Sequence, residues 1–347
     1  MRSQGFPSLP IVPRFLLATI GIVFLLTILA VPPSRAEVSE VRIAQQFGIG
    51  YLPFHVMKHE RLLEKEAARL GIDDLKVGWV NLAGGAAANE ALLSGSLDFV
   101  SGGVAAFVTL WAKTRGNLNV KGVAALDALP IYLVTNNPKV ASLRDLSDKD
   151  KIALPAIKVS IQAVTLQMAA EQTFGEGKHD ALDQWTVTLR HPDAYAALVS
   201  GKSEITGHFG APPYQEQELA QPGMRLLVNS YDVLDGPTTF NLVWTTQAFH
   251  DANPKVYAAF LAALRQAVAL INERPDAAAD IYLAEDDLKL DPAFVRKLIT
   301  SPEAKFTTTP INIMKYVDFM KKTNAVKTSA QSWKDAFFPE IHGEPGS

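Results

Sequence analysis

The chain of 347 residues contains no cysteine. This absence excludes disulfides, iron–sulfur clusters, thiol catalysis and the lipid anchor that is built on a cysteine after an apolar export segment. Basic runs are also missing, because the 33 Lys and Arg residues are scattered among 36 Asp and Glu residues, for a formal net charge of -3. Such a balance favours neither a nucleic-acid groove nor a basic helix on a membrane surface.

Catalytic sequence motifs are absent as well. The chain has no Gly-x-Ser-x-Gly elbow, no His-Glu-x-x-His pair and no Gly-x-x-x-x-Gly-Lys phosphate loop. The nearest metal signal is His55 and His59, four residues apart on a predicted helix beside Glu60. Two histidines on an ordinary surface helix explain that spacing without a metal, so we expect no cofactor and a binding protein rather than an enzyme.

One long apolar run is present, from Phe15 to Val31. Arginines precede it, and Ser34-Arg35-Ala36 follows with small residues where a signal peptidase cuts. We expect residues 1–36 to be a signal peptide cleaved after Ala36, with an uncleaved anchor as the alternative because the run is just short of a membrane span. Removal takes three arginines and no acid, which moves the formal charge from -3 to -6 and leaves 311 residues, enough for two domains.

The most informative pattern is a phrase that occurs twice, at 91–99 and at 197–205, as Ala-Leu-x-Ser-Gly-x-x-acid-apolar. Each copy is typical of a helix that ends at a glycine, Gly95 or Gly201, followed at once by a strand that begins with the acid. We expect each strand to lead into a glycine-containing loop, at 101–103 and 206–210. The pattern predicts two similar α/β lobes, with chance recurrence of a short phrase as the alternative.

The order of predicted elements supports this division. Strands are expected at 41–44, 75–80, 120–126, 131–134, 151–154, 185–189, 226–228 and 236–244, and helices at 54–70, 160–174, 193–201 and 254–275. Alternating strands and helices are typical of a doubly wound parallel sheet. We therefore predict an α/β fold with lobe 1 at 37–133 and 238–347, lobe 2 at 134–237, and a hinge of two crossings. In the last helix Asn253 is the expected cap and Pro254 the first residue.

Ligand-binding residues are expected where strands end and helices begin, since helix N-termini attract anions and open α/β sheets bind ligands at that edge. Ser160 either caps its helix or offers its hydroxyl to a ligand. Asp127, at a strand end, either accepts a ligand hydrogen bond or caps the next turn. Aromatic residues on the same predicted loops are candidates for an apolar wall: Tyr51, Phe54, Tyr132, Phe209 and Phe240.

The chain resembles the periplasmic substrate-binding proteins of nitrate, sulfonate and taurine ABC importers. The resemblance is carried by the glycine-rich loop at 47–53, Gly84-Gly85 before the first copy of the phrase, and Leu189-Arg190-His191-Pro192-Asp193-Ala194 before the second. It also includes Asn253-Pro254 with its long helix, and the tail segments at 313–320 and 332–340. The chain departs from the family pattern at two places: His208 to Pro212 stands where sulfonate and taurine binders tend to have Trp-Asp-Pro, and Val159 stands where many relatives have glycine.

The resemblance implies a type II periplasmic-binding-protein fold that traps a small organic anion, such as a sulfonate, a carboxylate or a pyrimidine-like compound, between its lobes. It also implies a permease and an ATPase of an ABC transporter as partners. The export signal predicts a periplasmic location, and a monomer is the simpler expectation because closure of the lobes needs no partner. Combined with the positions above, the expected ligand contacts are Tyr51, Pro53, Gly85, Ser101, Gly102, Asp127, Ser160, Gln162, His208, Phe209 and Thr239.

Two alternatives remain open at this stage. Enzymes of thiamine pyrimidine synthesis share the fold, and an enzyme here would need His208 or His55 as its acid–base group. Their cysteine-rich signature does not exist in this chain, and an exported protein does not suit an intracellular synthesis. A periplasmic sensor subunit would use the same binding residues as a transport receptor.

Overall fold

The structure is a computed structural model that describes residues 1, 4–5, 37–286 and 289–347. The apolar run and the expected cleavage residues lie outside the described residues. Residues Glu37–Ser347 form one compact unit. Its strands are β1 (Glu40–Gln45), β2 (Lys76–Asn81), β3 (Val100–Gly103), β4 (Lys121–Ala125), β5 (Asp127–Ala128), β6 (Tyr132–Thr135), β7 (Ile152–Leu154), β8 (Thr186–Thr188), β9 (Gly207–Phe209), β10 (Arg225–Asn229), β11 (Asn241–Thr245) and β12 (Lys305–Phe306).

The helices of the unit cover these strands. They are α2 (Leu52–His59), α3 (Leu62–Arg69), α4 (Gly85–Leu93), α5 (Val104–Thr114), α6 (Ile161–Phe174), α7 (His191–Ser200), α8 (Tyr214–Leu219), α9 (Ser230–Val233), α10 (Gln247–Ala252), α11 (Pro254–Glu273), α12 (Pro275–Glu285), α13 (Pro292–Ile299) and α14 (Met314–Lys322). Short 3₁₀ turns are η1 (Ile49–Tyr51), η2 (Leu143–Asp145), η3 (Asp183–Trp185), η4 (Trp333–Ala336) and η5 (Pro339–Ile341).

The first lobe is built on strands in the order β2-β1-β3-β11-β4. Strands β1 and β2 are parallel, and a parallel bridge between Ile43 and Phe99 joins β1 to the residue before β3. Strand β11 pairs antiparallel with β3 on one side and with β4 on the other. The sheet is therefore mixed rather than wholly parallel, because β11 comes from the end of the chain that returns to this lobe.

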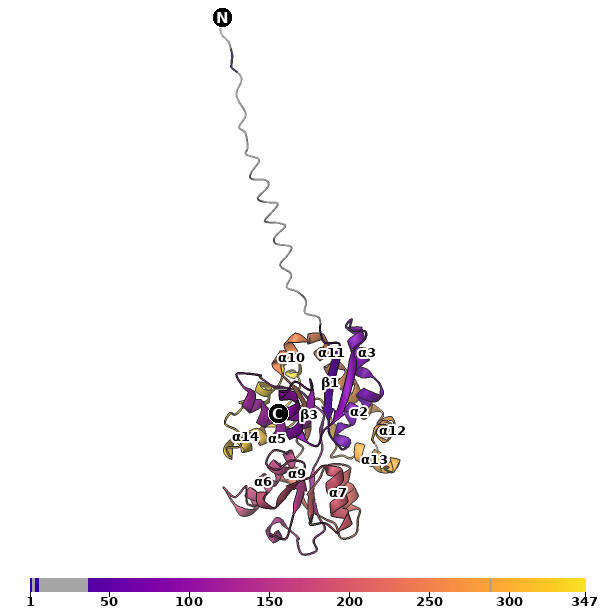
Figure 1. The fold of residues 1–347 in the computed structure, drawn as a ribbon, viewed down its shortest axis with the longest axis vertical. Coiled ribbons are helices and arrows are strands. Elements are labelled where there is room, and N and C mark those ends of the chain that lie inside the picture. The colour runs from indigo at the N-terminus through magenta and orange to yellow at the C-terminus, as the bar shows by residue number, and fades with distance from the viewer. Residues whose placement is uncertain (2–3, 6–36, 287–288) are drawn as a thin grey trace. The chain divides into compact units, whose positions relative to one another are not determined.

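The second lobe repeats this plan in the order β8-β7-β9-β6-β10. Strand β7 is parallel to β8 and β9, whereas β6 is antiparallel to both β9 and β10. Position by position, β9 occupies the place of β3 and β6 the place of β11. The expectation of two similar α/β lobes joined by two crossings is confirmed, and Figure 1 shows α6, α7 and α9 together in the second lobe.

The repeated phrase marks equivalent corners of the two lobes. Gly95 follows α4 with φ of 71° and Gly201 follows α7 with φ of 61°, so both helix ends use the left-handed conformation that glycine adopts without strain. The strands begin later than expected, at Val100 and Gly207. The expected loops at 101–103 and 206–210 are mostly strand, since the carboxyl ends of β3 and β9 carry those residues.

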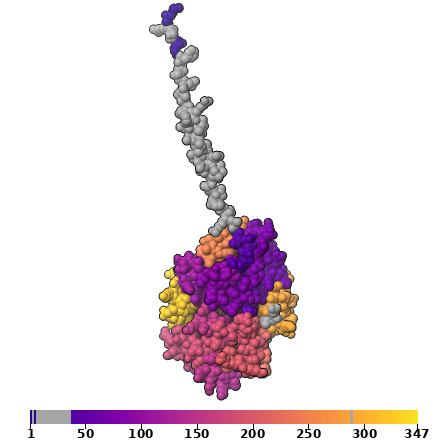
Figure 2. All heavy atoms as spheres, viewed as in Figure 1, coloured from indigo at the N-terminus to yellow at the C-terminus, as the bar shows by residue number. Residues whose placement is uncertain are grey.

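The chain crosses between the lobes twice, once before β6 and once before β11. Because β6 pairs with strands of the second lobe, the first crossing lies before Tyr132, and the expected boundary after residue 133 would fall inside this strand. The exact lobe boundaries stay a prediction. Figure 2 shows the magenta to rose atoms of the second lobe as one end of the compact unit, while indigo, orange and yellow segments make up the first lobe.

The local structure differs from the predictions at three places. The helix expected at 54–70 is two helices, α2 and α3, because Arg61 between them takes a left-handed φ of 52°. Helix α5 was not predicted. At the start of α11, the side chain of Asn253 accepts from the Val38 amide instead of capping the helix, and the Glu37 carboxylate accepts from the amides of Lys255 and Val256.

Helix α11 is a core helix. Its expected apolar stripe is buried, from Tyr257 and Phe260 to Val268 and Ile271. Among the described residues it is the helix whose length and composition would suffice to span a membrane. Phe260 stacks on Phe99 at a ring distance of 4.0 Å, which fastens this helix beneath the central strands of the first lobe.

Candidate functional site

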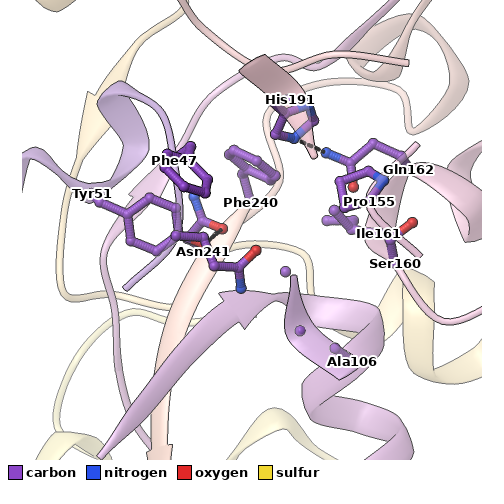
Figure 3. Close-up of a pocket in the computed structure, with 13 residues that line it drawn as sticks. Phe47, Tyr51, Ala106, Pro155, Ser160, Ile161, Gln162, His191, Phe240 and Asn241 are labelled. Atoms are coloured by element: carbon purple, nitrogen blue, oxygen red, sulfur yellow. Dashed lines mark hydrogen bonds between the residues drawn. The ribbon is translucent and has the colours of Figure 1, made fainter. Parts of the chain in front are cut away.

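A small cavity lies where the carboxyl ends of the central strands of both lobes meet (Figure 3). A water-sized sphere can occupy about 20 Å³ of it, which is room for about one water molecule. The first lobe and the returning crossing contribute Gln46, Phe47, Tyr51, Gly85, Gly103, Ala106, Phe240 and Asn241 to its wall, and the second lobe contributes Pro155, Ser160, Ile161, Gln162 and His191.

Four helices begin at this cavity. Gly85 is the first residue of α4, Gly103 precedes α5, Ile161 is the first residue of α6 and His191 the first of α7. Neither α4 nor α7 has a side-chain cap, and Ser160 caps α6 only through the amide of Ala163. The N-terminal turns therefore present amide donors and the positive ends of helix dipoles to one small volume.

None of the residues that line the cavity is Lys, Arg, Asp or Glu. The guanidinium of Arg190 lies 5.7 Å from the centre of the ring of Phe47, a lining residue, and pairs with Asp193. Figure 3 shows Phe47, Phe240 and Tyr51 on one side of the cavity and Gln162, Ile161 and Ser160 on the other. The site thus combines aromatic surface with polar donors, without a full charge in its wall.

A buried polar network lies behind the aromatic side. The Tyr51 hydroxyl donates to Asn241 Oδ1 at 3.0 Å, and Asn241 donates to Asp127 from its side-chain Nδ2 at 3.2 Å and from its backbone amide at 3.3 Å. Burial raises the pKa of the Asp127 carboxyl well above its usual range. Asp127 therefore orients Asn241 and through it Tyr51, while it does not itself line the cavity.

A second buried chain leads away from the cavity on the side of the second lobe. Gln162 Nε2 lies 3.3 Å from His191 Nε2, His191 Nδ1 lies 2.9 Å from His208 Nε2, and His208 Nδ1 lies 2.5 Å from Glu218 Oε1. Both histidines and Glu218 are buried. Burial lowers the pKa of His208 to about 3 and raises that of Glu218 to about 9, and it lowers that of His191 well below the usual range.

The two lobes touch around the cavity. A Cβ on Gly103 of the first lobe would lie 2.5 Å from Cγ2 of Ile161 in the second, so only glycine fits there. The Ile49 amide donates to the Pro212 carbonyl at 3.0 Å. These contacts describe a closed arrangement of the lobes, in which the cavity is shut off from most of the solvent.

Four residues expected at the site line the cavity: Tyr51, Gly85, Ser160 and Gln162. Seven others do not line it, namely Pro53, Ser101, Gly102, Asp127, His208, Phe209 and Thr239. The backbone and the core use them instead: the Ser101 hydroxyl donates to the Ala44 carbonyl at 2.6 Å, and the Thr239 hydroxyl accepts from the Ile311 amide at 2.8 Å. Pro53 is inside α2, and Phe209 is fully buried in β9.

Sequence reasoning missed His191 and Asn241, the two residues that connect the cavity wall to the buried carboxyls. His191 stands in the segment Leu189–Ala194 that carried the family resemblance, so its place at a helix start was visible but its role was not. Asn241 follows Phe240, which was predicted as an aromatic wall residue. Of the other aromatic candidates, Tyr51 lines the cavity, whereas Phe54, Tyr132 and Phe209 do not.

The two histidines of α2 face different surroundings. His55 is buried and stacks on Tyr282 at a ring distance of 5.3 Å, while His59 Nδ1 contacts Glu285 Oε1 at 3.2 Å on the surface. Among the described residues no three His, Asp or Glu side chains gather as a metal site would require. Neither histidine touches the cavity between the lobes.

The fold is that of the two-lobed periplasmic binding proteins. The alkanesulfonate-binding protein SsuA of Xanthomonas axonopodis pv. citri, solved with MOPS, is 20% identical with a TM-score of 0.66 over 84% of this chain and 95% of that chain. The periplasmic nitrate-binding protein NrtA of Synechocystis PCC 6803 is 13% identical with a TM-score of 0.68, over 86% of this chain and 85% of that one.

The description of a third similar structure names the fold and no ligand. A Candida albicans gene product, described as defining a new family with the generic periplasmic binding protein fold, is 16% identical with a TM-score of 0.66, over 86% of this chain and 96% of that chain. No protein-family model matches the sequence, and no curated protein matches it. At these identities the likeness establishes the fold, and the fold expected from the family resemblance is confirmed.

Proposed function

We propose that the protein is the ligand-binding component of an ABC importer, of the nitrate, sulfonate and taurine type, and that it traps a small organic anion between its lobes. The observation that carries this proposal is the convergence of four helix N-termini on one cavity with walls from both lobes. Amide donors and helix dipoles stabilise an anion without a paired cation. The solved sulfonate- and nitrate-binding proteins of the same fold support the same class of ligand.

The cavity favours an organic anion over a bare inorganic one. Phe47, Phe240 and the ring of Tyr51 give it an apolar side that an ion such as nitrate would leave unused. In the closed arrangement of the lobes the cavity is too small for an organic anion, so the lobes open to admit the ligand and close again around it. Closure then follows from the ligand's higher affinity for the closed form, and the closed form is what a permease recognises.

The binding role needs no catalytic group, and the candidates for one lie outside the cavity. His208 is separated from the cavity by His191, and His55 is in the core beside Tyr282. This placement supports a receptor rather than an enzyme. A periplasmic sensor subunit would use the same cavity, and it differs only in the membrane protein that the closed form contacts.

Export to the periplasm is part of the proposal. The compact unit begins at Glu37, directly after the expected cleavage site, and its first residues are tied to α11 by the Glu37 and Val38 contacts. N-terminal sequencing of the protein isolated from a periplasmic extract tests this. A first residue of Glu37 supports cleavage after Ala36, and a membrane-bound chain with its original N-terminus contradicts it.

The binding function is tested by a thermal-shift screen against alkanesulfonates, nitrate, aliphatic and aromatic carboxylates and pyrimidines. A ligand at a hundredfold its Kd stabilises the folded state by about 2.7 kcal/mol. We expect a selective rise in Tm with one class of organic anion. A screen in which no anion raises the Tm, while a neutral compound does, would contradict the anion part of the proposal.

Two phenylalanines provide a matched pair of variants for that screen. Phe47 and Phe174 are both partly buried, and each has an arginine guanidinium 5.7 Å from its ring centre, but only Phe47 lines the cavity. We expect Phe47→Leu to abolish most of the ligand-induced shift and Phe174→Leu to retain it. Equal losses in the two variants would place the ligand elsewhere.

A further inference from the structure

The buried row of hydrogen-bonded side chains from Glu218 to Gln162 can hold its protons in two ways, and it ends in the wall of the cavity. Its four side chains are joined end to end by three short contacts, and its first member, Gln162, is the one whose amide borders the cavity together with His191 (Figure 3). We propose that the Glu218–His208–His191 chain is a one-proton switch that decides whether Gln162 offers a ligand its amide NH2 or its amide oxygen. This inference rests on the proposed function of the cavity as a ligand site.

The hydrogen bonds allow two consistent proton arrangements. We call the first the empty form, because the extra proton is absent. In it Gln162 Nε2–H donates to His191 Nε2, His191 Nδ1–H donates to His208 Nε2, and His208 Nδ1–H donates to the Glu218 carboxylate. The distances of 3.3, 2.9 and 2.5 Å are compatible with this order of donors and equally with its reverse, because the roles depend on the histidine tautomers. Gln162 then turns its amide oxygen toward the cavity.

The second arrangement, the loaded form, contains one more proton, taken up from solvent. With that proton in the short bond between Glu218 and His208, His208 Nε2–H donates to His191 Nδ1, and His191 Nε2–H donates to Gln162. An N–H cannot donate to an amide NH2, so the Gln162 amide rotates by half a turn and its oxygen accepts. Its NH2 group then faces the cavity, where it can donate to an anion.

The surroundings favour uptake of this proton at neutral pH. Glu218 Oε2 is buried and has no hydrogen-bond partner among the described residues, which destabilises a carboxylate there. Burial accordingly raises the pKa of Glu218 to about 9. A raised acid pKa means that the proton is held below this pH and lost above it, so the loaded form prevails at pH 7.

Among the described residues, the charged and titratable groups packed around Glu218, His208 and His191 supply no cation that would keep the Glu218 carboxyl ionised. Helix α8 contributes Glu216, whose pKa is raised to about 7 by burial, and Tyr214, whose ring stacks on His191 at 6.0 Å. Helix α7 contributes Asp193, which pairs with Arg190 at the surface, and β6 contributes Tyr132. The charged side chain of helix α6 is Glu171, which pairs with Lys322, and strand β7 has no titratable side chain. The negative charge of an ionised Glu218 adds to the rise in the pKa of Glu216 that burial causes.

The tautomer of His191 tests the proposal without any ligand. Long-range ¹H–¹⁵N correlation spectra of histidine-labelled protein distinguish Nε2–H from Nδ1–H, and the His191 signals are assigned by comparison with His191→Gln. We expect His191 to carry its proton on Nε2 at pH 7 and to change to Nδ1 in a single step between pH 8 and 10. A His191 tautomer that stays the same from pH 6 to 10 would overturn the proposal.

Glu218→Gln removes the titrating group and preserves its shape. We expect His191 to keep one tautomer at every pH in this variant, and a tautomer change like that of the wild type would contradict the proposal. If this variant does not fold, the wild-type titration still decides. The ligand arm uses methanesulfonate and nitrate as probes in calorimetry: affinity should fall about tenfold per pH unit above the midpoint in the wild type, and Gln162→Leu should lose this dependence.

These two arms separate the switch from the proposed function. If neither probe binds but the tautomer of His191 changes as expected, the anion ligand is wrong and the switch stands. If a probe binds with the same affinity from pH 6 to 10 and the tautomer does not change, the receptor stands and the switch is wrong.

Discussion

The hydroxyl groups of Thr165 and Tyr316 hydrogen-bond at 2.9 Å in a buried contact between the lobes. Thr165 belongs to α6 of the second lobe, and Tyr316 belongs to α14, which packs on α5 of the first lobe. Together with the contact of Ile49 on Pro212, this bond stabilises the closed arrangement around a cavity too small for a ligand. Under the proposed binding function, lobes that already attract one another need less differential affinity from the ligand to close.

Removal of this bond should favour the open form. In Tyr316→Phe the aromatic ring stays, and the hydroxyl loses its hydrogen bonds to Thr165 and to Thr238. The bond to Thr165 is worth about 1 kcal/mol, so we expect the open population to rise about fivefold. Because the chain has no cysteine, Lys76→Cys and Lys202→Cys give one dye site on each lobe. Single-molecule energy transfer between these sites measures the two populations.

The control for that variant is Tyr257→Phe. Its hydroxyl is buried in the first lobe and has no hydrogen-bond partner among the described residues, so the same chemical change leaves the lobe contact intact. We expect the populations of Tyr257→Phe to equal those of the wild type. A shift of equal size in both variants would show that Tyr316 acts through general stability.

Gly103→Ala should block closure. The backbone of Gly103 is extended, with φ of -69° and ψ of 152°, so alanine causes no strain within the first lobe. Its Cβ would instead meet Ile161 of the second lobe at 2.5 to 2.7 Å. We expect at least a tenfold loss of ligand affinity, measured by calorimetry with the compound found in the screen, and a change in Tm of the free protein of less than about 4 °C.

A smaller residue at position 161 should allow the lobes of this variant to close. In Gly103→Ala with Ile161→Gly, both atoms that the new Cβ would meet, Cγ2 and Cβ of Ile161, are removed, and we expect most of the affinity to return. Gly84→Ala is the matched control, since its Cβ would lie 3.4 Å from Pro155 across the same interface, an ordinary contact. Loss of affinity in this control, or no rescue by the second substitution, would contradict closure as the cause.

The sequence predicted the parts of the fold that are set locally. Gly95 and Gly201 marked two helix ends because a left-handed cap is a property of a few neighbouring residues, and this identified the duplicated lobe. The antiparallel direction of β6 and β11 was not predictable, because it depends on which distant strands they join. Tyr51 and Ser160 line the cavity, and the sequence pointed to them because they stand at the ends of elements. Asp127 and His208 were also expected to contact a ligand, and the structure places them one layer behind the cavity wall.

Asp127 should make the protein less stable as pH rises. Its folded pKa is raised well above the usual range by burial, so the folded state holds a proton that the unfolded state has lost above about pH 4. The free energy of unfolding therefore decreases by about 1.4 kcal/mol per pH unit between the two pKa values from this group alone. Asp127→Asn, which retains an acceptor for the Asn241 amide, should remove this part of the decrease.

Urea unfolding at pH 5 and pH 8 measures the effect. We expect the free energy of unfolding of Asp127→Asn to increase relative to that of the wild type as pH rises. Asp150→Asn is the control, because hydrogen bonds from Asn137, Ser147 and Thr206 outweigh burial and lower the pKa of that carboxyl. Its contribution to stability is complete above about pH 4, so the difference between Asp150→Asn and the wild type should be the same at pH 5 and pH 8. A change with pH as large as that of Asp127→Asn would contradict the assignment.

Glu37 should stabilise the protein as the cap of α11. Its two carboxylate oxygens accept from the amides of Lys255 at 2.9 Å and Val256 at 2.7 Å, where Asn253 gives the helix no side-chain cap. Loss of a cap costs about 1 kcal/mol, so Glu37→Ala should lower the Tm by a few degrees. Glu40→Ala, an exposed change at the start of β1, is the control and should leave the Tm unchanged. Equal Tm values for Glu37→Ala and the wild type would show that the cap adds nothing to the stability of the protein. They would also remove the structural reason to expect cleavage to leave Glu37 in place.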